Sequence, residues 1–126
     1  MGTHAMIGVV NEDGSVTATY CHYDGYLEGV GRTLVDHYSH PIEAVSLALV
    51  GYLSSLGPNI HESIANSAHK NQVPVPYESV LQFMENGYDW AGAEYLYLFD
   101  GEAWFYASRY AEDTRFEEVE MNLKAA

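Results

Sequence analysis

The first hydrophobic pattern along the chain is that of a β-hairpin. Residues 6–10 and 16–21 are β-prone, and residues 11–14 between them end in Asp-Gly. This pair is a strong hairpin signal, because both central residues of a type I′ turn need a positive φ. Since side chains alternate along a strand, the second strand is predicted to have two faces. One face carries Val16, Ala18 and Tyr20, and the other carries Thr17, Thr19 and Cys21.

A second hairpin with more aromatic strands is predicted near the other end of the chain. Residues 94–99 and 102–106 flank Asp100 and Gly101. Alternation places Tyr95, Tyr97 and Phe99 on one face of the first of these strands, and Leu96 and Leu98 on the other. Both faces are bulky, so we expect helices to cover one side of this hairpin.

Between the hairpins the hydrophobic period becomes that of helices. The first helix is predicted from Tyr26, with Asp24 or Gly25 as its cap and a core-facing stripe of Leu27, Val30, Leu34 and Tyr38. A second helix is predicted to open at Pro41. Its buried stripe would be Ile42, Val45, Leu49 and Leu53, and residues 56–58 would close it.

Residues 58–76 show no clean period and are predicted to form a long loop with one short helical turn at 62–68. Pro76 is then expected to open a third helix. Tyr77, Val80, Leu81 and Met84 would lie on one side of it, with Gly87 beyond its end.

These elements predict an α+β fold in which two antiparallel β-hairpins form one sheet with about three helices on one face. The 126 residues suit one domain, which we place at 6–110. Residues 1–5 precede a second methionine and are interpreted as a leader outside the fold. Residues 111–126 are interpreted as an acidic tail or as a short docked helix, because Phe116, Val119 and Leu123 keep a helical spacing.

The charge of the chain restricts its partners. Eighteen acidic residues against five Lys and Arg give a net charge of −13 and a pI near 4.5. Such a charge repels phosphate backbones, so direct nucleic-acid binding is disfavoured, while a basic protein would be attracted. The simpler alternative is that acidity keeps a small protein in solution. The longest apolar stretch is too short and interrupted to span a bilayer, and a single cysteine fits a reducing cytoplasm.

The candidate functional cluster lies where the second strand ends and the first helix begins. It comprises Tyr20, Cys21, His22, Tyr23, Asp24 and Tyr26, with His37 from the end of that helix. If the chain stays extended, His22 and Asp24 point to one side and could act as base and orienter, with Cys21 or a tyrosine as reacting group. Cys21 alternates to the other face, which argues against a Cys-His couple. In a structural alternative, the motif is a hydrogen-bonded corner that locks the hairpin to the helix.

A metal or nucleotide site has little support. Asp36, His37 and His40 could approach one another only if the helix continued, and Pro41 indicates that it stops. Gly25, Gly29 and Gly31 lack the order of a phosphate-binding loop. We therefore predict neither a bound metal nor a cofactor.

The aromatic hairpin is a candidate protein-contact surface, because acidic residues lie beside its aromatic ones. This surface would comprise Glu94, Tyr95, Tyr97, Asp100, Glu102, Trp104 and Tyr106. The alternative is that these aromatic side chains belong to the core.

Several motifs of the chain resemble a family of small uncharacterised proteins of bacteriophages and prophages. The family run is I/V-Y-C-H-x-D-G-Y-P-x-x-V-G-x-x-L-x-x-H-Y, and this chain matches it with Tyr20, Cys21, His22, Asp24, Gly25, Tyr26, Val30, Gly31, Leu34, His37 and Tyr38. The runs at 53–57 and 94–99 follow in the family order. The chain departs from the family with Tyr23 in place of tryptophan and Leu27 in place of proline.

The resemblance implies a phage origin and no particular chemistry. Small acidic phage proteins are often inhibitors of host machinery, including restriction and CRISPR effectors. The leading hypothesis is therefore a phage-encoded protein of the host cytoplasm that binds and inhibits or redirects a basic or nucleic-acid-binding host protein, for counter-defence or host takeover, with nucleic-acid mimicry as one form. The alternative is a small enzyme or ligand-binding protein built on His22 and Asp24. A homodimer is left open.

Overall fold

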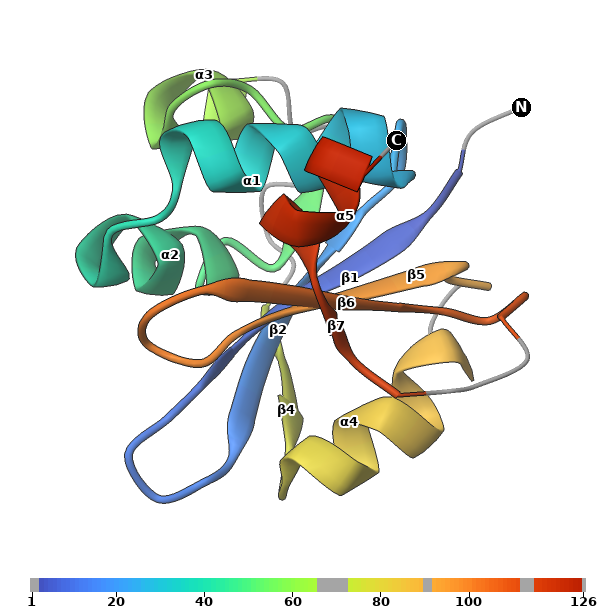
Figure 1. Ribbon diagram of the computed structural model, residues 1–126. Coiled ribbons are helices and arrows are strands. Elements are labelled where there is room, and N and C mark those ends of the chain that lie inside the picture. The colour runs from blue at the N-terminus through green and yellow to red at the C-terminus, as the bar shows by residue number, and fades with distance from the viewer. Residues whose placement is uncertain (1–2, 66–72, 90–91, 112–114, 126) are drawn as a thin grey trace.

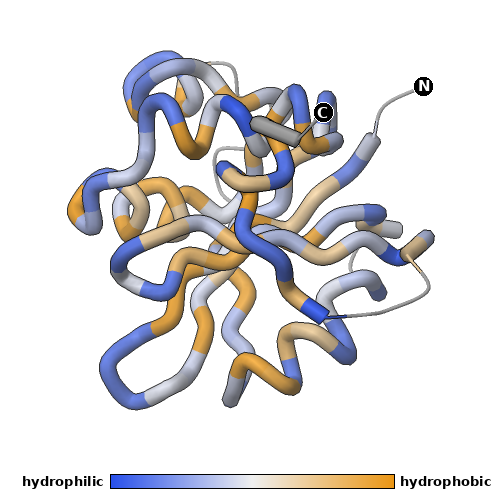
Figure 2. The backbone as a smooth tube through the Cα atoms, viewed as in Figure 1, coloured by the Kyte–Doolittle hydropathy of each residue, from blue (hydrophilic) through white to orange (hydrophobic). Residues whose placement is uncertain are grey.

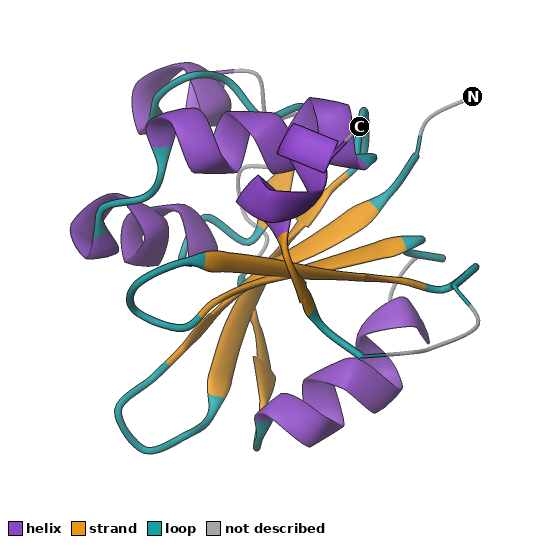
Figure 3. Ribbon diagram, in the orientation of Figure 1, coloured by secondary structure: helices purple, strands orange, loops and turns teal. Residues whose placement is uncertain are grey.

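A computed structural model describes residues 3–65, 73–89, 92–111 and 115–125 of the chain. Over these residues the fold is α+β, with a mixed seven-stranded sheet and helices against it (Figures 1 and 3). The strands are β1 (Ala5–Val10), β2 (Val16–Cys21), β3 (Tyr52–Leu53), β4 (Val75–Tyr77), β5 (Tyr95–Phe99), β6 (Trp104–Ser108) and β7 (Glu117–Glu118). The helices are α1 (Arg32–His37), α2 (Pro41–Ala48), α3 (Ile60–Ala65), α4 (Val80–Asn86) and α5 (Val119–Ala125), with a π-helical turn η1 (Leu27–Gly31) and a 3-10 turn η2 (Gly87–Asp89).

Both predicted hairpins are confirmed, and a parallel pairing joins them. The strand order is β3-β2-β1-β5-β6-β7, in which β1 and β5 are parallel, and β4 pairs with β2. The predicted type I′ turns are wrong. Gly14 and Gly101 have positive φ, whereas Asp13 and Asp100 do not, because residues 11–15 and 100–103 form loops longer than a two-residue turn.

Strand alternation sorts the side chains into two cores. On one face Ile7, Val9, Cys21 and Tyr97 pack with Leu34 of α1, Leu47 of α2 and Val119 of α5. On the other face Met6, Tyr20 and Leu96 pack with Phe83 of α4. The predicted faces of the strands are thus confirmed, and so is the core-facing stripe of the first helix. The prediction of helices on one face is incomplete, because α4 covers the opposite face (Figure 1).

The predicted stripe of the second helix is wrong. Its buried residues are Ala44, Leu47 and Ala48, whereas Ile42, Val45 and Leu49 are exposed. Small alanines let α2 lie close to β1 and β2, which it contacts, and this turns the larger side chains outwards. The helix also ends earlier than predicted, and Leu53 lies in β3 beside Cys21.

The predicted third helix begins four residues late. Pro76 lies within β4, which pairs with Val16–Ala18 at the sheet edge, where proline is tolerated. Ser79 caps α4 by accepting a hydrogen bond from the Gln82 amide at 3.0 Å, and the Gln82 side chain accepts one from the Glu78 amide at 2.6 Å. This reciprocal pair resembles a capping box, a signal present in the sequence. In the predicted loop, α3 occupies 60–65, and residues 66–72 lie outside the described residues.

Both ends of the described chain join the fold. Residues 4 and 5, interpreted as part of a leader outside the fold, belong to the sheet: β1 begins at Ala5, and the His4 carbonyl accepts a hydrogen bond from the Glu94 amide at 2.9 Å. At the other end, β7 pairs with β6, and α5 buries Val119 and Leu123 against the first core. This segment is therefore a short docked helix over its described part.

The orientation of α2 can be tested by paired truncations. Leu47→Ala should lower the free energy of unfolding by about 2–5 kcal/mol, because it opens a cavity in the core. Ile42→Ala should change it by less than about 0.5 kcal/mol, because that side chain is mostly exposed. Chemical denaturation of both variants provides the measurement. A larger loss for Ile42→Ala than for Leu47→Ala would show that α2 faces the sheet with the predicted stripe.

Candidate functional site

The strand-exit motif continues β2 as far as Tyr23 and then turns sharply. The His22 amide donates to the Leu53 carbonyl at 2.9 Å, and the Tyr23 amide donates to the Ser54 carbonyl at 3.0 Å. Asp24 then adopts a left-handed conformation with φ of 60°, which ends the extended geometry. Strand alternation therefore does not extend to Asp24, so it no longer predicts that His22 and Asp24 lie on one side.

Gly25 is where the backbone of the motif packs closely against the segment before β1. Its amide donates to the Thr3 carbonyl at 2.7 Å, and a Cβ at this position would lie 2.7 Å from that oxygen and 2.9 Å from Ala5 Cβ. Only glycine fits such a backbone contact. The Gly25 carbonyl accepts a hydrogen bond of 2.7 Å from the buried hydroxyl of Tyr97 on β5.

The predicted cap of the first helix is wrong in its chemistry. The helical run begins with η1 after Tyr26, and neither Asp24 nor Gly25 caps it with a side chain. Instead the Asp24 carbonyl accepts a hydrogen bond from the Val30 amide at 2.9 Å, and a Cβ on Gly29 would collide with the same oxygen. The absence of a side chain at Gly29 therefore lets the first helical turn pass close to the Asp24 carbonyl.

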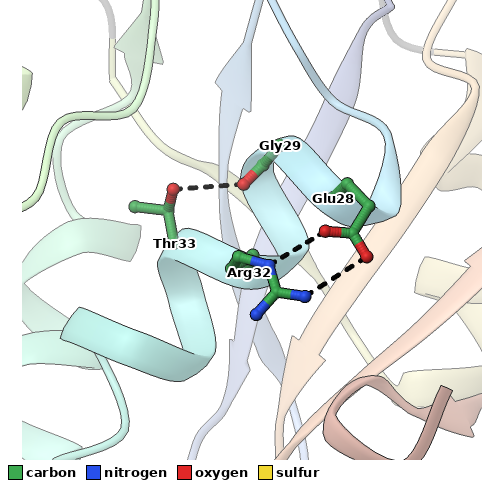
Figure 4. Close-up of polar contacts among 4 residues, drawn as sticks. All are labelled: Glu28, Gly29, Arg32 and Thr33. Carbon is green, nitrogen blue, oxygen red and sulfur yellow. Dashed lines mark hydrogen bonds and ion pairs between the residues drawn. The ribbon is translucent and has the colours of Figure 1, made fainter. Parts of the chain in front are cut away.

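Two side-chain contacts hold the junction between η1 and α1 (Figure 4). Arg32 Nε donates to Glu28 Oε2 at 2.9 Å, and the Thr33 hydroxyl donates to the Gly29 carbonyl at 3.1 Å. Since both members of the ion pair are about half exposed, it contributes little to stability. The ion pair does neutralise the charge of Arg32, one of the few basic side chains of the protein.

His22 belongs to an aromatic cluster at the end of β2. Its ring stacks on His4 with centroids 4.5 Å apart, and its Nδ1 lies 3.0 Å from the Tyr20 hydroxyl. Burial raises the pKa of Tyr20 to about 12, so the phenol stays protonated and can donate to His22 Nδ1. His4 Nδ1 donates to the His22 carbonyl at 2.6 Å. Tyr52 packs on Tyr20 with ring centroids 5.3 Å apart. The pairing of β2 with β3 that brings Tyr52 here is not visible in the sequence, whereas His4 lies opposite His22 by continuation of the predicted hairpin.

The remaining candidate residues are dispersed. Asp24 is exposed at a pocket of about 140 Å³ that it shares with Tyr23, Glu28, Gly29, Val30, Thr33 and Leu56. Tyr26 is exposed, and His37 is exposed at the end of α1. Neither His22 nor Tyr26 lines this pocket. The structure thus places Tyr23 and Asp24 at one pocket, and His22, Tyr26 and His37 away from it.

Cys21 lies where a thiol is a poor nucleophile. It is fully buried in the first core, and burial raises the pKa of its thiol from 9.0 to about 12. Its Sγ donates a weak hydrogen bond to the Tyr23 carbonyl at 3.4 Å. Burial of this kind disfavours a covalent mechanism through Cys21.

The predicted contact surface on the second hairpin is wrong in two of its aromatic residues. Tyr97 and Trp104 are buried, and the Trp104 indole donates to the Tyr38 carbonyl at 3.0 Å. Tyr95, Tyr106 and Glu94 are half-buried. Asp100 and Glu102 are exposed in the turn, where the Asp100 carboxylate accepts from two backbone amides at 2.9 Å.

Sequence reasoning missed a buried polar junction beneath α3. The Tyr38 hydroxyl donates to the Gly57 carbonyl at 2.8 Å and lies 3.0 Å from the Ser63 hydroxyl, which accepts from the Gly57 amide at 2.8 Å. Tyr38 was predicted only as an apolar core residue. The junction ties the end of α1 to the segment before α3.

Neither comparison with known proteins nor the arrangement of the possible metal ligands assigns a function to this geometry. No protein-family model, no curated protein and no solved structure matches the chain. Within the described ranges, no group of three or more His, Cys, Asp or Glu side chains could hold a metal ion. None of the helices in these ranges is long and apolar enough to cross a membrane.

The corner can be tested with two tyrosines on one strand face. Tyr97→Phe should lower the free energy of unfolding by about 1–3 kcal/mol, because the buried Gly25 carbonyl loses its donor. Tyr95→Phe, at a half-buried position on the same face, should change it by less than about 0.5 kcal/mol. Denaturant titration of both variants measures the difference. Equal small effects would argue against the Tyr97 hydroxyl as a structural link.

The chemical state of Cys21 can be tested by alkylation. At pH 8 a thiol of pKa about 12 has roughly a thousandfold less thiolate than one of pKa 9.0. The native protein should therefore resist iodoacetamide for hours, whereas the protein in guanidinium chloride should react within minutes. Mass spectrometry follows the reaction. Rapid labelling of the folded protein would contradict the buried, protonated thiol.

Proposed function

We propose that this protein is a phage-encoded acidic binder of the host cytoplasm that occupies a basic or nucleic-acid-binding host protein and inhibits or redirects it. It acts by binding, without turnover. The observation that carries the proposal is the outward placement of its carboxylates: every acidic side chain in the described residues is exposed or half-buried.

The five Lys and Arg of the sequence offset little of the charge of its eighteen Asp and Glu. The Arg32 guanidinium is paired with Glu28. Arg109 donates to the Tyr88 carbonyl at 3.1 Å and lies over the Tyr88 ring, 5.6 Å from its centroid. With a net charge of −13, the molecule carries a negative potential that speeds encounter with basic proteins and repels nucleic acid.

The host and the biological setting come from the resemblance to phage proteins. Inhibition of a restriction or CRISPR effector is the counter-defence form of the proposal, and such a protein would be an anti-CRISPR or anti-restriction factor. Redirection of a host enzyme is the takeover form. Either target handles nucleic acid and presents a basic surface, which suits an acidic ligand.

Close mimicry of nucleic acid receives less support than general charge attraction. A mimic needs carboxylates in a row like phosphates. Here they lie at both hairpin loops, as in Glu12 and Asp100, and on several helices, as in Asp36 and Glu43. We therefore favour recognition of a basic protein through a limited contact surface.

The alternative, an enzyme or ligand-binding protein based on His22 and Asp24, has weaker support. The two side chains lie in different surroundings, and the pocket beside Asp24, at about 140 Å³, is smaller than the ~300–1,000 Å³ of usual ligand sites. The feature that best supports this alternative is the stacking of the His4 and His22 rings.

The proposal can be tested by capture from nuclease-treated host lysate on the immobilised protein. Retained proteins should be basic and should be released as NaCl rises from ~0.1 to ~0.5 M, because salt screens the attraction. The control is a variant with Glu12, Glu43, Glu62 and Glu102 each changed to Gln. It should retain the same proteins more weakly. Retained proteins without basic bias, or binding that ignores both salt and the control changes, would contradict the proposal.

A further inference from the structure

The exposed face of α2 carries aliphatic side chains that the packing of its buried face does not need. Ile42 is 71% exposed, Val45 is 44% exposed and Leu49 is 58% exposed, whereas Ala44 and Ala48 are buried against the sheet. These three aliphatic residues, here called the α2 face, recur at the spacing of one helical stripe. Single exposed aliphatic residues are common, but a stripe of them is typical of an interaction site.

The sheet does not account for the α2 face. The helix contacts β1 and β2, and its residues buried in the core are Ala44, Leu47 and Ala48. Figure 2 shows hydrophobic segments along α2, which lies at the outside of the fold. The pattern is that of a helix with two hydrophobic faces, of which the fold uses one.

The surroundings of the α2 face are acidic. Glu43 lies on α2 itself and Glu62 on α3, which contacts α2. No Lys or Arg occurs in the sequence between Arg32 and Lys70. Residues 33–69, which carry the apolar stripe, thus contribute carboxylates and histidines but no Lys or Arg.

The charge of the molecule favours one kind of partner for the α2 face. Three aliphatic side chains cannot fill the ~800 Å² per partner of a standard interface, so the contact must extend onto the surrounding surface. A second copy of the chain would bring like charges together there, at a cost in free energy. A protein with basic side chains around an apolar patch would meet opposite charges instead.

We propose that the α2 face docks on an apolar patch ringed by Lys and Arg on the partner protein, with Ile42, Val45 and Leu49 in contact with the patch and Glu43 and Glu62 facing the basic rim. This inference rests on the proposed function, and it assigns the contact surface to α2 in place of the aromatic hairpin.

The experiment uses a defined probe and the full chain. The probe is a peptide of about 18 residues of Leu and Lys whose leucines fall on one helical face, and the second probe is a scramble of the same composition. Each is titrated into ¹⁵N-labelled protein. The amphipathic peptide should shift the amide signals of residues 42–49 most, and should bind at least about tenfold more tightly than the scramble.

Two matched variants localise the contact. Val45→Ser with Leu49→Ser should weaken binding of the amphipathic peptide by at least about tenfold, with little change in melting temperature. Leu81→Ser removes an aliphatic side chain that is 63% exposed on α4, and it should leave the affinity unchanged. Equal loss in both variants would overturn the inference.

The remaining outcomes separate this inference from the proposed function. Binding of both peptides alike, with shifts outside α2, would overturn the α2 assignment and leave an acidic binder. No binding of either peptide would count against both. Sedimentation of the free protein tests the other occupant: a dimer that Val45→Ser with Leu49→Ser dissociates would overturn the choice of a basic partner and make the α2 face a self-association surface.

Discussion

The hydrogen bond from the Tyr97 hydroxyl to the Gly25 carbonyl joins the middle of the sheet to the corner that carries the motif. Gly25 also donates to Thr3, next to β1, so a single residue links the chain start, β5 and the entry to η1. A buried carbonyl without a donor is costly, and a side chain at Gly25 would collide with backbone. The position of η1, and with it α1, depends on this contact.

The corner determines how the chemically suggestive residues of the motif are placed. The turn at Asp24 separates its carboxylate from His22, and the Cys21 thiol is buried beneath the helices. Gly29 lets η1 wrap around the Asp24 carbonyl. The motif thus fixes the position of η1 and α1. The groups that a partner could contact are the surface carboxylates and the α2 face.

Local signals predicted the hairpins, the strand faces and the stripe of the first helix, since turn residues and alternation act over a few residues. The parallel pairing of β1 with β5 joins segments far apart in sequence, and no local pattern encodes it. For α2, the period of Ile42, Val45 and Leu49 suits a buried stripe as well as a docking face. Which face is buried depended on how closely Ala44 and Ala48 let the helix approach the sheet. At the candidate site, the predicted alternation of side chains ends at Asp24, because the backbone of this residue is left-handed.

Native-state hydrogen exchange measured residue by residue by NMR tests the central claim most directly, which is that the corner is part of the cooperative core. The Gly25 and Val30 amides, which donate to the Thr3 and Asp24 carbonyls, should be protected to within about tenfold of the amides that pair β1 with β5. Exchange at these two amides several orders of magnitude faster than in the sheet would show a corner that opens locally, and would contradict the account.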